Sequence, residues 1–123
     1  MMNRKMVALV LAGMIVATVA TVLAWDDTDM DIKQGSYGIA IAVVRANYNA
    51  QGKITAWDGD YDGGWKPGVT PPEGWSATNV GNCGTIPDKD YPPWDSVWAD
   101  SYTYILDQYN RIKEYVSASA SLP

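Results

Sequence analysis

The hydrophobic pattern changes character once along the chain, near residue 24. Met6 to Ala24 carries no charged residue, Arg4 and Lys5 precede it, and the acidic stretch 26–29 follows it. A basic start, an apolar stretch and a small-residue end are typical of an export signal. The order of charges, basic before and acidic after, places the N-terminus inside. We therefore expect residues 25–123 to be exported and to work at the cell surface or beyond it.

The apolar segment has two fates that the sequence leaves open. Its 19 residues, Met6 to Ala24, fall just short of the roughly 20 that a membrane span needs. They are also many for the apolar core of a cleaved signal. Residues 1–24 are therefore either a signal removed after Ala24 or a retained anchor, which would be the protein's one contact with a membrane.

Alternation of bulky and small residues gives the clearest element of the remaining chain. Met30 and Ile32 alternate with charged residues in 25–35, which predicts an extended arm. Ser36 to Val44 predicts a strand whose two faces differ in size. The bulky face is Tyr37, Ile39, Ile41 and Val43, and the small face is Gly38, Ala40, Ala42 and Val44. Both faces are apolar enough to be buried, the small one against a close neighbour.

The middle of the chain predicts two shorter strands separated by loops. Lys53–Trp57 completes a hairpin with the first strand, and Trp75–Val80 forms another short strand. The glycine- and proline-rich stretch 58–74 is expected to be a loop, as is 81–93. Residues 36–123 then form one exported domain after the arm.

Periodicity supports two interpretations of the segment after Trp94. A helical stripe at spacings of three and four predicts a helix over 98–116, and Asp107 and Arg111 are well placed as an i,i+4 ion pair. Tyr102, Tyr104 and Leu106 also alternate as in a strand. The stripe is Trp98, Tyr102, Ile105, Tyr109, Ile112 and Val116. Periodicity alone slightly favours the helix.

Charge and composition exclude several classes of function. All 14 acidic residues follow the leader, whereas Arg4 and Lys5 of the 9 basic ones lie within it, so export leaves a net charge of −7. This argues against nucleic acid as a partner. Histidine is absent and Cys83 is the one cysteine, which removes the common nucleophile pairs, makes zinc improbable and forbids an internal disulfide. We expect no enzyme, and a Cys83 that packs as a small apolar residue.

One motif carries candidate metal chemistry. Asp58, Asp60 and Asp62 precede Gly63 in the pattern D-x-D-x-D-G, which is typical of loops that bind Ca²⁺ through oxygen ligands. The residue at loop position 12 is Val69 rather than glutamate, so the motif is not an EF-hand. A solvated acidic turn explains the pattern equally well. Calcium is the one cofactor that the sequence suggests.

Two stretches resemble a known family. The first joins Val22–Asp29 to Ile32–Ile41, and the second joins Tyr91–Val97 to Tyr102–Val116. They are similar to the TasA/camelysin-type exported fibre subunits and related archaeal bundling pilins. The resemblance implies a mostly β fold, a small jelly-roll-like β-sandwich after the leader, with the C-terminal segment as two strands. Residues 108–110 lack the glycine usual in the family's turn.

The resemblance also implies a function. Subunits of that family join when the N-terminal arm of one completes the sheet of the next, so the implied partner is another copy of the chain. We expect the contact to use Trp25, Met30, Ile32, Tyr37, Ile39 and Ile41. The alternative is an anchored accessory subunit, a membrane helix with a small α+β domain, whose acidic outer part docks on a membrane complex through a helix over 98–116.

Overall fold

Six strands account for nearly all of the described chain. The computed structural model describes residues 24–123, and the predicted leader lies outside them except for Ala24. Each strand follows the last through a short turn or loop, and the described residues contain no helix. The strands are β1 (Asp27–Gln34), β2 (Gly38–Tyr48), β3 (Ile54–Trp65), β4 (Ser76–Ile86), β5 (Ser96–Leu106) and β6 (Ile112–Leu122).

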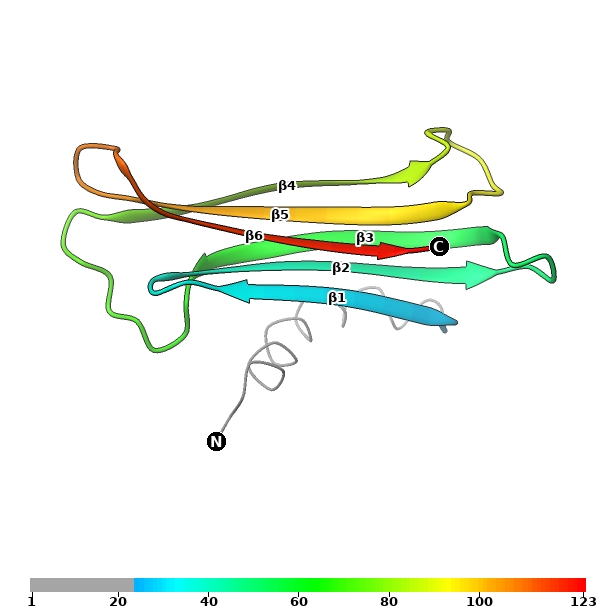
Figure 1. Cartoon of the computed structure of the whole chain (residues 1–123), viewed down its shortest axis with the longest axis horizontal. Coiled ribbons are helices and arrows are strands. Elements are labelled where there is room, and N and C mark those ends of the chain that lie inside the picture. Colours follow the sequence, from blue (N-terminus) through cyan, green and yellow to red (C-terminus); the bar gives the residue numbers. More distant parts are fainter. Residues whose placement is uncertain (1–23) are drawn as a thin grey trace.

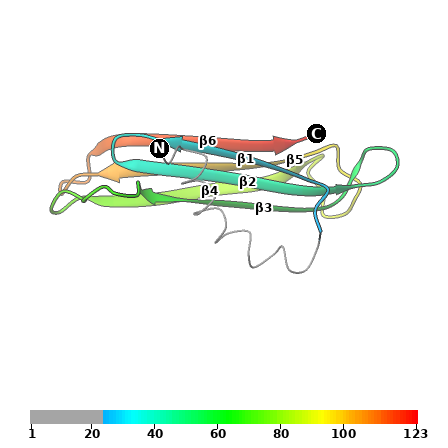
Figure 2. The ribbon, with the colours of Figure 1, turned by 90° about the horizontal axis from the view of Figure 1, so that it is seen from below.

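The strands form two antiparallel sheets that pack face to face. The first sheet has the order β1-β2-β3 and the second the order β4-β5-β6. Figures 1 and 2 show them as two layers, with β1 beside β6, β2 over β5 and β3 over β4. The mostly β sandwich that the resemblance implies is thus confirmed for residues 24–123, which are all β. The jelly-roll connectivity is wrong, because the chain crosses between the sheets only once, from β3 to β4, instead of repeatedly.

Small side chains fill the space between the sheets. Ala40, Ala42, Val44 and Ala46 of β2 face the second sheet, which confirms the prediction that the small face meets a close neighbour. The matching side chains of β5 and β6 are Val97, Ala99, Val116, Ala118, Ala120 and Leu122. Residues this small let the two layers approach closely, so each added methyl group would be felt.

Glycine at position 63 shows how close that approach is. A Cβ on Gly63 would lie 2.3 Å from Thr103 Oγ1 and 2.5 Å from Asn79 Nδ2. Thr103 donates to the carbonyl of Ile39 at 2.8 Å and thereby ties the sheets together. Gly63 therefore permits sheet packing and does not turn a metal loop. The predicted loops are wrong for residues 58–65, which continue β3, and for 81–86, which continue β4.

The C-terminal segment is two strands, so the helix over 98–116 is wrong. The inward residues of β5 alternate, and several are small or polar: Val97, Ala99, Ser101, Thr103 and Ile105. Because these residues are small or polar, the alternation typical of a strand is not apparent when only bulky apolar positions are considered. Asp107 and Arg111 do form an ion pair at 2.8 Å, but across the β5–β6 turn. Asn110 has φ 60°, so it takes the left-handed conformation that favours glycine.

Candidate functional site

The first sheet carries an apolar surface on its outer face, away from the second sheet. Residues paired across antiparallel strands point to the same side. The pairings Met30↔Val43 and Ile32↔Ile41 therefore place these side chains together, opposite to the small face of β2. They form a cluster separate from the inter-sheet core: Met30, Ile32, Ile39, Ile41 and Val43. We call this set the outer cluster.

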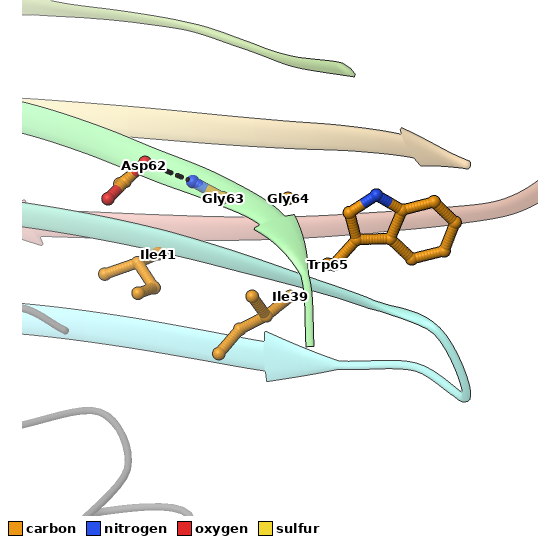
Figure 3. Close-up of a pocket in the computed structure, with 6 residues that line it drawn as sticks. All are labelled: Ile39, Ile41, Asp62, Gly63, Gly64 and Trp65. Atoms are coloured by element: carbon orange, nitrogen blue, oxygen red, sulfur yellow. Dashed lines mark hydrogen bonds between the residues drawn. The ribbon is translucent and has the colours of Figure 1, made fainter. Parts of the chain in front are cut away.

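No described strand lies over the outer cluster (Figure 1). Its β2 members are almost fully buried, with at most 3% of Ile39, Ile41 or Val43 exposed. A pocket of roughly 140 Å³ opens beside Ile39 and Ile41, bordered by Asp62 and Trp65 of β3 (Figure 3).

Arg45 continues the same face beyond Val43. Its side chain is only 1% exposed, and its Nη1 forms an ion pair with Asp58 of the neighbouring strand. Nε and Nη2 have no hydrogen-bond partner among the described residues. These two nitrogens form the side-on fork of the guanidinium, which matches a carboxylate in bidentate geometry. A buried arginine with a free fork is costly unless an acceptor reaches it.

The three aspartates of the predicted calcium motif stand in a row along β3. Asp58, Asp60 and Asp62 pair with Arg45, Val43 and Ile41, so all three lie on the outer face. Alternate residues of a strand are about 6.6–6.8 Å apart, whereas calcium ligands lie 2.3–2.6 Å from the ion. Residues 24–123 contain no group of three acidic, cysteine or histidine side chains arranged around one point. Calcium binding remains a prediction.

Carboxylates close the side of the sandwich where β1 lies beside β6. Asp29 accepts a hydrogen bond from the N–H of Ser121 at 3.0 Å, and Asp31 accepts one from Ser119 at 2.9 Å. Lys33 also pairs with Asp31 at 2.6 Å. These aspartates occupy outward N–H groups of β6 that would otherwise offer an edge for pairing.

Glu114 of β6 holds the connection between β1 and β2. Its two oxygens accept hydrogen bonds from the N–H groups of Ser36, Tyr37 and Gly38 at 2.8–3.0 Å. Burial by itself raises the pKa of Glu114, but these three N–H groups and the charge of Lys66 outweigh it and leave the pKa below its ordinary value. Glu114 therefore stays ionised and acts as a latch on this connection.

The other two predicted contact residues, Tyr37 and Trp25, are not members of the outer cluster. Tyr37 precedes β2 and packs against Trp75, with ring centroids 5.3 Å apart. Trp25 precedes β1, and its indole N–H is buried without a hydrogen-bond partner among the described residues. Of the predicted set, the structure brings Met30, Ile32, Ile39 and Ile41 into one cluster.

Cys83 packs as expected for a structural residue. It lies against the inter-sheet core, with Sγ 3.8 Å from the carbonyl oxygen of Gly59. Burial, and then the charges of Asp58 and Asp60, raises the pKa of its thiol. The thiolate, which is the reactive form, is therefore disfavoured at neutral pH.

Sequence reasoning missed Arg45 and Glu114. Arg45 stands two residues after Val43 and so continues the bulky face, a signal that alternation alone contains. Glu114 gives no such signal, because its partners lie more than 70 residues away.

Comparison with known proteins adds no relative. No family model, curated protein or solved structure matches this chain. In residues 24–123, no helix has the length and apolar character to cross a membrane.

Proposed function

We propose that this chain is a structural subunit of an extracellular filament, exported through residues 1–24 and polymerised by N-terminal strand addition. The main support for the proposal is the position of β1 in the fold. This strand is a terminal edge strand that pairs with β2 alone, and three residues, 35–37, connect the two. An edge strand so attached can pair with β2 of another copy instead of its own.

The contacts of β1 define what an exchanged arm would bind. Met30 and Ile32 would pack on Val43 and Ile41 of the neighbouring copy in the register seen within one chain. Burying two such side chains contributes on the order of 3–6 kcal/mol. The closed monomer makes the same contacts, so the connection and the protein concentration decide between the two forms. Short connections favour exchange.

Donation in one direction leads to a filament. If each copy gives its arm to the next and receives one from the previous copy, the contact is head-to-tail and does not close on itself. A reciprocal exchange would instead give a closed dimer. The export prediction supports the extracellular setting, and a single cysteine, which cannot form a disulfide within the chain, favours assembly as the source of durability.

The alternative function loses its docking element. An anchored accessory subunit depends on a helix over 98–116, where the chain forms β5 and β6. Its remaining support is the apolar leader. The intact mass of the native protein separates the two: a chain beginning near Trp25 supports secretion, and one beginning at Met1 supports an anchor.

The test is removal or disruption of the arm in exported protein. Deleting 25–34 should leave a soluble domain that forms no filaments, and Ile32→Asp should have nearly the same effect. Ile86→Asp is the matched control, because Ile86 is 55% exposed on the other sheet and outside the arm. Negative-stain microscopy and sedimentation give the readout.

Two results would refute the proposal. Filaments that form normally without the arm would exclude strand addition. A wild-type protein that remains monomeric and bound to the membrane would favour the anchored subunit.

A further inference from the structure

We infer that aspartate and asparagine side chains block backbone pairing at the free sheet edges and so direct strand addition to β2, a direction that rests on the proposed function, whereas the blocking does not. The residues concerned are Asp60 and Asp62 of β3 and Asn82 of β4. Two of the three belong to the aspartate motif, for which sheet packing alone gives no role.

The side of the sandwich formed by β3 and β4 holds two unpaired sheet edges. These strands end their sheets and lie beside each other, opposite to the side formed by β1 and β6 (Figure 2). No described strand pairs with either outer edge. In an antiparallel ladder, the N–H groups of successive residues point alternately toward the partner strand and away from it. An end strand therefore presents every second N–H group to a strand of another molecule.

In the middle of β3, carboxylates already occupy these outward N–H groups. Asp60 accepts a hydrogen bond from the N–H of Tyr61 at 2.8 Å, and Asp62 accepts one from Gly63 at 2.8 Å. The hydrogen bond that closes the β1–β2 turn fixes the alternation along β2, and strand register then directs both N–H groups away from β2. Tyr61 and Asp62 are exposed, so the two bonds lie where an incoming strand would pair.

The same arrangement recurs on the other end strands. Asn82 accepts the N–H of Cys83 on β4, and Asp27 accepts that of Thr28 on β1, both at 2.9 Å. On β6, aspartates of β1 accept two outward N–H groups. Each of the four end strands therefore has at least one outward N–H group bound to a side chain, and a new ladder at these edges has to replace that bond.

The edge of β2 differs from the other four. When β1 leaves, β2 frees outward N–H groups at Ala40, Ala42, Val44 and Ala46. Residues 38–46 contain neither aspartate nor asparagine, so no side chain of this segment occupies them as Asp60 does on β3. A strand from another copy therefore meets an open ladder on β2 and a blocked one on β3 or β4.

The test compares three double variants, each of which removes two negative charges from the exported protein. Asp60→Ala/Asp62→Ala frees two N–H groups of β3 and should lower the concentration at which assemblies sediment about tenfold or more. Asp60→Asn/Asp62→Asn keeps a side-chain acceptor, as Asn82 provides on β4, and should behave as its parent. Asp88→Ala/Asp90→Ala is the control for charge, because both residues are exposed in the loop between β4 and β5.

Ile32→Asp is the parent of all three variants, because it prevents assembly through the arm. Circular dichroism below the sedimentation threshold checks that each variant is folded. Hydrogen exchange locates the contact, since the amides of residues 59–63 should exchange more slowly in the assembled alanine variant of β3. If the Ile32→Asp parent is unfolded, the same hydrogen-exchange comparison in the wild-type background decides.

Three results would overturn the inference. The alanine variant of β3 could sediment no more readily than its parent, the asparagine or loop variant could assemble to the same extent, or the β3 amides could stay unprotected in the assemblies. If the wild type forms no filaments but the alanine variant assembles through β3, the edges are blocked as inferred and the proposed function is wrong. If wild-type filaments depend on the arm and the alanine variant stays monomeric, the proposed function holds and these side chains do not block the edges.

Discussion

Single residues in this protein often have a role other than the one their type suggests. Gly63 follows three alternating aspartates, a pattern typical of a metal loop, yet it lies where two sheets meet and no Cβ fits. Asn110 replaces glycine in the β5–β6 turn by adopting φ 60°. Arg45 is charged but buried beside an aliphatic cluster. Such roles follow from what each residue touches in the folded sandwich.

Asp58, Asp60 and Asp62 are the residues through which calcium would act. If the row of aspartates binds calcium, the ion should raise the melting temperature of the wild type relative to chelator, because a ligand that binds only the folded state stabilises it. The gain is about 2.7 kcal/mol at a calcium concentration 100 times the Kd. The double variant Asp60→Ala/Asp62→Ala should lose this increase. Differential scanning calorimetry checks it, and equal melting temperatures with calcium and chelator would show that the aspartates bind none.

Among the elements, β1 is an edge strand held mainly by side chains on its outer edge. It pairs with β2 on one edge, and on the other it reaches β6 through the carboxylates of Asp29 and Asp31. Glu114 then holds Ser36, Tyr37 and Gly38, where β2 begins. These side-chain bonds stabilise the closed position of β1, so they oppose its exchange between copies.

Weakening the latch should therefore release β1. Glu114→Gln keeps an acceptor but loses the charge, and it should cost roughly 1 kcal/mol of unfolding free energy, whereas Glu114→Ala leaves three N–H groups without an acceptor and should cost about 1–3 kcal/mol. Urea unfolding measures the stability, and hydrogen exchange of the β1 amides measures the opening. Glu73→Gln is the control, since Glu73 lies in a loop and accepts no hydrogen bond from a described residue. Unchanged exchange of β1 in Glu114→Ala would show that Glu114 is not a latch.

Across the whole molecule, one side of the sandwich depends on ionised carboxylates. Burial works against the charge of Asp31, but hydrogen bonds from Lys33, Ser119 and Ile32 leave its pKa below the ordinary 3.8. The pKa of Glu114 is likewise below 4.5. A folded-state pKa below the unfolded one stabilises the protein above the unfolded pKa and loses that stability as pH falls through the folded value.

The melting temperature should therefore fall with acid. Stability from these two groups is fully present above about pH 5 and declines from pH 4.5 downward, through 3.8 and below, as the folded protein takes up protons. Calorimetry between pH 6 and 3 checks this, and Glu114→Gln should show a shallower dependence over the same range. A melting temperature that rises on acidification would contradict the assignment.

Local alternation in the sequence was sufficient to predict part of this fold. Ser36 to Val44 predicts a strand with a bulky and a small face, and β2 has both, because side-chain direction along a strand is a local property. The outer position of Met30 and Ile32 beside Ile41 and Val43 follows from the same period once β1 pairs with β2. For this reason the predicted contact residues on β1 and β2 lie in one cluster.

Contacts between distant strands account for what the pattern could not predict. The stripe over 98–116 favours a helix because β5 buries small and polar residues, and these count as core only when a second sheet lies within reach. The sequence predicts a loop for residues 58–65, because a glycine beside alternating aspartates gives no local indication that the segment pairs with another strand. The free fork of Arg45 and the latch of Glu114 likewise arise from tertiary contacts. Local sequence encodes the direction in which a side chain points, whereas packing between sheets decides what it meets there.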